Sequence, residues 1–114
     1  MAIIIVTPPK KLSEEDFEKA REDYQSYIKI TADIENEIVV LGGEYHADAE
    51  KKLLEMGSKQ ENIWGGGYNL SINEVETNAM INIRTGRNDN PEILDAKIKA
   101  KFIKLTEKVL HEFI

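Results

Sequence analysis

The stretch GGEYHADAEKKLLEMGSKQENIWGGG, from Gly42 to Gly67, is the part of the chain around which the other segments are organised. Two glycines precede a helical pattern over about Ala47 to Met56, and Gly57 stands where a left-handed residue ends a helix. Trp64 and three consecutive glycines follow, in a segment that predicts a bulged or closely approached strand. The stretch therefore predicts a helix between two strands, with polar residues at both helix ends.

Four further segments on either side of this stretch have strand patterns. Ile3 to Val6 is a short apolar run typical of a covered strand. Apolar and polar residues alternate over Ile28 to Ile34, and a second apolar run over Ile38 to Leu41 predicts an antiparallel hairpin. The alternation over Val75 to Ile83 is the clearest strand pattern in the chain.

Two amphipathic helices complete the pattern. Ser13 precedes three acidic residues, which predicts a capped helix start. The apolar face of this helix is expected to carry Phe17, Ala20, Tyr24 and Tyr27. The apolar face of the last helix is expected to carry Ile98, Phe102, Leu105, Val109 and Phe113.

The order of elements is strand, helix, strand, strand, helix, strand, strand, helix. It predicts an α+β two-layer sandwich, with a mainly antiparallel sheet and helices on one face. The first six elements follow the ferredoxin-like order, although order alone does not determine strand pairing. A length of 114 residues with 41% hydrophobic residues predicts a single domain over 1–114.

Composition narrows the function classes. The net charge of -6 argues against binding to a nucleic-acid backbone. The chain has no cysteine, so any metal must be held by His, Asp and Glu. The sequence has neither a signal-peptide pattern nor an apolar run long enough to span a membrane, which predicts a cytoplasmic protein.

Three motifs in register carry a family resemblance. They are GGEYHAD at Gly42–Asp48, GSKQENIWG at Gly57–Gly65 and MINIR at Met80–Arg84. Together they resemble the signature of a small prokaryotic domain of unknown function. The resemblance runs from about Ile28 into the last helix, and it implies no established activity, ligand or catalytic residue.

Glu44, His46 and Asp48 are the candidate catalytic and metal-ligating residues. They lie at two-residue steps across the junction between the two glycines and the helix, so extended backbone would place them on one side. Two carboxylates and an imidazole suit a divalent metal, or a base with its orienting partner. The same residue types also suit a helix start without any chemistry, with Asp48 as the cap.

The candidate ligand-binding residues are Lys59, Gln60, Trp64, Arg84 and Arg87. Lys59 and Gln60 suit an anion site, although a lysine after a helix C-terminus is also explained by the helix dipole. Trp64 suits a stacking wall or the core, and the glycines beside it predict a backbone that something must touch. The two arginines suit a carboxylate or phosphate, or a solvated turn.

Two functional hypotheses follow. In the first, the protein is a ligand-binding or interaction domain with a polar pocket around His46, Lys59, Trp64 and Arg84, for a small polar or anionic ligand. In the second, it is a metal-dependent or histidine-based hydrolase. The last helix also carries a lysine stripe that suits either a solvated face or the acidic helix of a second copy in a homodimer. The lysines of this stripe are Lys97, Lys101, Lys104 and Lys108.

Overall fold

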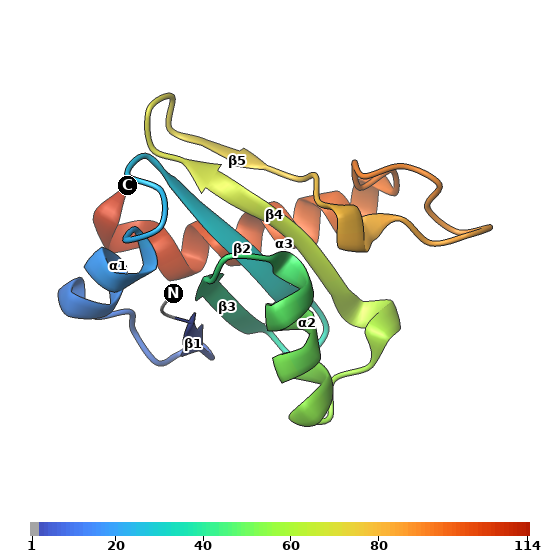
Figure 1. Ribbon diagram of the computed structural model, residues 1–114, viewed down its shortest axis with the longest axis horizontal. Helices are drawn as coiled ribbons and strands as arrows, with labels where there is room; N and C mark the ends of the chain where they lie inside the picture. Colours follow the sequence, from blue (N-terminus) through green and yellow to red (C-terminus); the bar gives the residue numbers. More distant parts are fainter. Residues whose placement is uncertain (1–2) are drawn as a thin grey trace.

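The computed structural model describes residues 3–114 and contains one open antiparallel sheet in the order β1-β3-β2-β4-β5 (Figure 1). The strands are β1 (Ile3–Val6), β2 (Tyr27–Asp33), β3 (Ile38–Gly42), β4 (Ile63–Asn69) and β5 (Glu74–Glu76). The α-helices are α1 (Glu14–Ala20), α2 (His46–Glu55) and α3 (Ala96–Leu110). Short 3-10 helices cover Gln60–Asn62, Met80–Asn82 and His111–Phe113.

The central hairpin forms as the alternating pattern predicts. β2 and β3 pair antiparallel, with Asp33 opposite Ile38 and Ile30 opposite Leu41. β2 pairs on its other edge with β4 over its whole length. Because side chains alternate along a strand, Ile28, Ile30 and Ala32 enter the same core cluster.

Two connections that pass over the sheet place helices on both of its faces. β1 is parallel to β2, with β3 between them, and β3 is parallel to β4, with β2 between them. Connections between parallel strands of one sheet are almost always right-handed. Both connections run across the sheet in the same direction, from the β1 edge toward the β5 edge. The strands β1 and β2, however, point opposite to the strands β3 and β4. The helices α1 and α2 therefore lie on opposite faces.

The α+β class, the antiparallel sheet and the element order are confirmed, but the placement of the helices needs correction. The expectation that the helices cover one face is wrong for α2, whose Ala49 and Leu53 pack with Val40 and Ile63 on the other face. Figure 1 shows α2 in front of the sheet and α3 behind it. The ferredoxin-like arrangement does not form, because β4 pairs with β2 rather than with β1.

The main core lies between the sheet, α1 and α3. Its buried members include Leu12, Phe17, Ile28, Ile30, Leu41, Trp64, Tyr68, Phe102, Leu105 and Val109. The Phe17 ring stacks on the Phe113 ring, with centroids 4.4 Å apart. The end of the chain is therefore packed against α1 and lies near the segment that precedes α1.

Two element boundaries differ from the sequence patterns. The alternation over Val75 to Ile83 yields only the short strand β5, followed by the 3-10 helix Met80–Asn82. Because the chain changes direction here, the Asn82 side chain forms the hydrogen bonds to the Gly65 backbone that a neighbouring strand would otherwise form. The first helix ends at Ala20, before the tyrosines that continue its apolar pattern.

The end of α2 is confirmed as a glycine cap. Gly57 has a φ of 98°, a conformation that glycine adopts at little cost. The Ser58 N–H donates to the Leu53 carbonyl and the Gly57 N–H donates to the Leu54 carbonyl, which is the paired pattern of a Schellman motif. Within residues 3–114, none of the helices has the length and apolar character needed to cross a membrane.

Candidate functional site

The three sequence motifs meet around β4. The His46 ring at the start of α2 donates from Nε2 to the Gly66 carbonyl at 2.7 Å. The Asn82 side chain accepts from the Gly65 N–H at 2.8 Å and donates to the Gly65 carbonyl at 2.9 Å. The Arg84 guanidinium lies 4.0 Å from the centroid of the Trp64 ring. These contacts hold α2 and the loop after β5 against one strand.

The glycines of β4 make room for side chains of the protein itself. A Cβ added at Gly65 would lie 2.7 Å from the Ala79 Cβ. At Gly66 it would overlap the Glu76 carbonyl oxygen and lie 2.8 Å from the Phe102 ring, and at Gly67 it would overlap the Tyr27 ring. The expectation that something touches this backbone is met by the protein's own residues, so the glycines do not by themselves indicate a ligand.

His46 has an environment that favours its neutral form. Burial lowers the pKa of its imidazole, and the positive charge of Lys29 lowers it further, while the hydrogen bond to Gly66 acts in the opposite direction. Lys29 donates to the Glu44 carbonyl and lies 5.7 Å from the Tyr45 ring centroid. The histidine therefore fastens the start of α2 to β4 as a neutral donor.

The other two members of the predicted metal triad are not gathered with His46. Glu44 and Asp48 are exposed, and Asp48 lies in the first turn of α2 rather than capping it. The N-cap is Tyr45, whose side chain makes no capping hydrogen bond. Among residues 3–114, no group of three or more His, Cys, Asp or Glu side chains is arranged to hold a metal ion. This geometry gives the hydrolase hypothesis no support.

Lys59 and Gln60 lie at the far end of α2. Both are exposed. His46 is the first residue of α2, and this ten-residue helix is about 15 Å long at a rise of about 1.5 Å per residue, so its length separates the two groups. The residue just before them, Ser58, is buried and donates to the Asp33 carboxylate at 2.6 Å. Sequence reasoning missed Asp33, although an aspartate at a strand end before an Asn-containing turn is a recognisable signal.

The two candidate arginines have different surroundings. Arg84 is half-buried and donates to the carbonyls of Glu61 and Ile63, at the start of β4. Arg87 is exposed in the turn that follows. The loop is organised by buried Asn88, which donates to the carbonyls of Asn82, Asn90 and Glu92 and which sequence reasoning did not single out. Asparagine is common in turns, so its type alone did not mark it.

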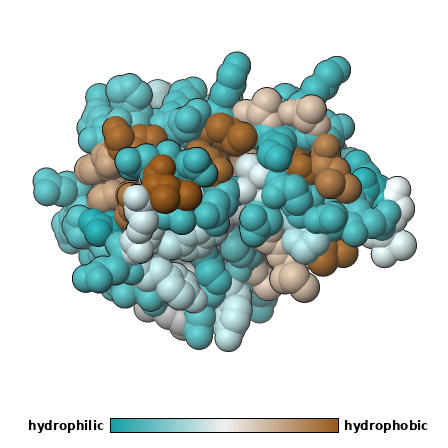
Figure 2. Space-filling model, turned by 90° about the horizontal axis from the view of Figure 1, so that it is seen from above, coloured by the Kyte–Doolittle hydropathy of each residue, from teal (hydrophilic) through white to brown (hydrophobic). Residues whose placement is uncertain are grey.

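The four residues of the expected polar pocket therefore do not share one cavity. His46 and Lys59 lie at opposite ends of α2. Trp64 is buried in the core on the other face of the sheet, with Arg84 over its ring. Figure 2 shows that hydrophobic residues on one face of the molecule form separate patches among hydrophilic ones, a pattern that is ordinary for a protein surface.

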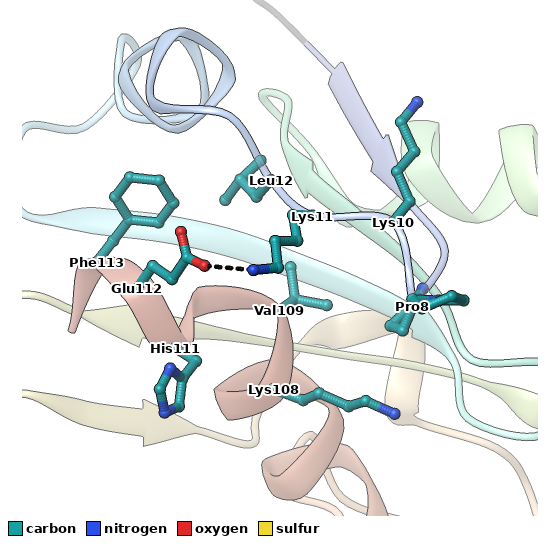
Figure 3. A pocket seen from close by; sticks show the side chains of 10 residues that line it. Pro8, Lys10, Lys11, Leu12, Lys108, Val109, His111, Glu112 and Phe113 are labelled. Carbon is teal, nitrogen blue, oxygen red and sulfur yellow. Dashed lines mark ion pairs between the residues drawn. The ribbon is translucent and has the colours of Figure 1, made fainter.

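A cavity of about 400 Å³ lies between the segment before α1 and the end of α3 (Figure 3). Ten residues line it: Pro8, Pro9, Lys10, Lys11, Leu12, Lys108, Val109, His111, Glu112 and Phe113. The volume is within the range of roughly 300–1,000 Å³ that is usual for small-molecule sites. None of the residues expected to bind a ligand is among them.

The cavity combines apolar walls with a lysine rim. Leu12 and Val109 are core residues, only 4% and 8% exposed. Figure 3 shows Lys11 reaching across to Glu112, with a distance of 3.1 Å between the charged atoms. Lys10 and Lys108 extend away from the walls in the same view. The lining of this cavity thus contains three lysines and one glutamate.

A second cavity of about 420 Å³ lies beside the middle of α3. It is lined by Ile34, Glu35, Glu37, Lys101, Lys104, Leu105 and Lys108. Lys108 lines both cavities and pairs with Glu37 at 3.4 Å. In the part of the chain that the structure describes, the side chains of Lys101 and Lys104 make no ion pair.

The fold and its motif contacts define a small α+β domain with an open antiparallel sheet. Residues 4–109 match the family model described as Protein of unknown function (DUF5674), and the chain belongs to this family. The resemblance to a domain of unknown function is thereby confirmed. No curated protein and no solved structure matches the chain significantly.

Proposed function

We propose that this domain binds a small anion with an apolar body, in the cavity between the Pro8–Leu12 segment and the end of α3. The observation that carries the proposal is the combination of a lysine rim and apolar walls in one cavity. The protein as a whole has a net charge of -6, so its overall field repels anions. A local group of lysines from two distant segments offsets that field at this point.

The lysines of the rim are available to a ligand. The ion pairs of Lys11 and Lys108 are solvent-exposed, with side-chain exposures of 81% and 60% for the two lysines. Exposed ion pairs contribute about 0.2–1 kcal/mol, so an anionic ligand can replace the glutamate of either pair at small cost. Lys10 makes no ion pair among residues 3–114, which leaves its ammonium free for an anionic group.

The apolar walls favour a ligand that is more than a bare ion. Leu12, Val109 and Phe113 offer carbon surface from both sides of the cavity. Burial of about 100 Å² of apolar ligand surface contributes about 2.5 kcal/mol, which exceeds the contribution of one exposed charge contact. A carboxylate or phosphate on an alkyl chain therefore fits the cavity better than an inorganic anion.

This proposal retains the ligand-binding hypothesis and its anionic ligand, with other residues in the site. The motif residues His46, Asn82 and Arg84 are occupied in holding β4 to its neighbours. Their proposed role is to stabilise the scaffold rather than to contact a ligand. Among residues 3–114, no group of three or more His, Cys, Asp or Glu side chains offers a metal centre to the hydrolase alternative.

Calorimetric titration with octanoate, octyl phosphate and octanol tests the proposal. Both anions are expected to bind, and octanol is expected to bind about tenfold more weakly because it lacks the charge. The double variant Lys10→Gln/Lys108→Gln is expected to weaken binding of both anions by about tenfold. Lys97→Gln is the matched control, because Lys97 is an exposed lysine on α3 that lines neither cavity.

Two outcomes would contradict the proposal. Equal affinity for octanol and octanoate, or an unchanged affinity in the double variant, would show that the lysine rim does not select anions. A change in sedimentation coefficient of the double variant would instead assign the lysines to an interface between copies. The acidic residues at the start of α1 would then be the natural partners of these lysines.

A further inference from the structure

We propose that the anionic group of the ligand is a diphosphate, held over Lys108 and extending into the second cavity. The ligand class is a short alkyl or prenyl diphosphate taken from solution. This inference rests on the proposed function of the first cavity and adds the identity of the head group. It is independent of the contacts around β4.

Lys108 connects the two cavities. It lines both of them, and Lys101 and Lys104 line the second cavity on the same side of α3. The three lysines follow each other at steps of three and four residues, which places them on one helix face. The span from Lys101 to Lys108 is about 10 Å at a rise of about 1.5 Å per residue. A single carboxylate is too short to use all three ammonium groups, whereas two linked phosphates reach further.

The division of apolar and charged residues assigns the two ends of the ligand. Leu12, Val109 and Phe113 in the first cavity suit the chain. The second cavity has fewer apolar residues, Ile34 and Leu105, and more charged ones. The volume of about 400 Å³ in the first cavity suits a short chain rather than a long membrane lipid.

Two glutamates also line the second cavity, and they sharpen the inference. Glu37 is paired with Lys108 at 3.4 Å, and the Glu35 side chain is exposed. A diphosphate must displace Glu37 to contact Lys108. Removal of the Glu37 charge should therefore strengthen diphosphate binding, while removal of the lysines should weaken it. The loss in the lysine variants is the discriminating effect, because Lys101 and Lys104 line only the second cavity, whereas Lys108 lines both.

The test compares geranyl diphosphate, geranyl monophosphate and octanoate by calorimetric titration. Lys101→Gln/Lys104→Gln is expected to weaken the affinity for geranyl diphosphate by about tenfold. The affinity for octanoate is expected to change by less than about twofold. Glu37→Gln is expected to strengthen geranyl diphosphate by about threefold. Lys97→Gln, outside both cavities, is expected to change neither ligand. Circular dichroism of each variant confirms that it is folded.

The outcomes separate this inference from the proposed function. One result overturns the diphosphate inference and leaves the first cavity as the site. In that result, octanoate binding depends on Lys10 and Lys108, but the affinity for the diphosphate is unchanged in the variants of Lys101, Lys104 and Glu37. Equal affinity of the wild type for the monophosphate and the diphosphate also overturns it. Failure of the wild type to bind any of the three ligands overturns both proposals.

Discussion

Asp33 at the end of β2 is expected to be the most sensitive polar position of the scaffold. Its residue is fully buried at 0% exposure, and its carboxylate accepts four hydrogen bonds. The donors are the backbone N–H groups of Glu35 and Asn36, the Asn36 side chain and the Ser58 hydroxyl. The carboxylate thus joins the turn between β2 and β3 to the end of α2.

The expected cost of Asp33→Ala is about 3–5 kcal/mol. Each hydrogen bond to a charged group contributes about 1.5–3 kcal/mol, but bonds to one acceptor are not additive. The variant also leaves the buried Ser58 hydroxyl without its acceptor, which costs about 1–3 kcal/mol. The total cost is lower than the sum of these contributions, because water can reach the backbone N–H groups of the exposed turn. Asp33→Asn keeps the shape and is expected to cost about half as much.

The acid dependence of stability gives a second readout of the same residue. Burial alone would raise the pKa of Asp33, but hydrogen bonds from Asn36, Ser58 and Glu35 outweigh it, and the pKa is lowered. A carboxyl group with a lowered folded pKa contributes stability that is fully present above its unfolded pKa of about 3.9. That contribution disappears as the pH falls through the folded pKa. The difference between wild type and Asp33→Asn should therefore shrink in acid.

Urea denaturation at pH 7 and at about pH 3 measures both effects, with the free energy of unfolding taken from the transition. Asp48→Asn is the control, because this exposed aspartate has no capping role and is expected to change stability by less than about 1 kcal/mol. A loss below about 1 kcal/mol in Asp33→Ala, or a loss in Asp33→Asn that is the same at both pH values, would refute the reasoning.

Three further predictions concern the contacts around β4. Gly66→Ala is expected to destabilise by about 3 kcal/mol or more, because the new methyl would overlap the Glu76 carbonyl oxygen of β5 and also press against the Phe102 ring, and thermal unfolding checks this. Asn82→Ala removes three hydrogen bonds to backbone, two of them to buried Gly65, and is expected to cost about 2–4 kcal/mol, with faster amide exchange at Gly65 as the local readout. Burial lowers the pKa of His46, so wild-type stability should fall as the pH drops below about 6.5, and His46→Gln should flatten that fall in urea titrations between pH 7 and 5.

The strand hairpin, the capped start of α1 and the glycine end of α2 were predictable because their signals are local. Alternation over Ile28 to Ile34 reflects one apolar face, which enters the main core, and Gly57 has a backbone conformation that few other residues adopt. The face on which α2 lies was not predictable from these signals. It depends on whether β4 joins the edge of β1 or of β2, and both choices satisfy the same alternation.

The clearest strand pattern failed for a physical reason. Ala79 and Ile81 are directed toward the backbone of β4, which satisfies a two-residue alternation without a continuous strand. Asn82 supplies donor and acceptor groups to Gly65 in place of a paired backbone. The sequence shows a polar residue at this position, but it does not show which distant backbone groups this residue bonds to.

The cavity at the end of α3 was also beyond the reach of sequence patterns. Its residues come from Pro8–Leu12 and from Lys108–Phe113, which lie at opposite ends of the chain. The lysine stripe of α3 was visible in the sequence, but its neighbours were not. The contact between the two ends depends on tertiary packing, including the stack of Phe17 on Phe113.

The most direct test of the central claim is an amide chemical-shift titration of the isotope-labelled protein with octanoate. Binding in the proposed cavity predicts saturable shift changes confined mainly to residues 10–12 and 108–113. The amides of His46 and Gly65 to Gly67 should remain unchanged. Shift changes centred on β4 and the start of α2, or no saturable change at any residue, would contradict the claim that this cavity is the binding site.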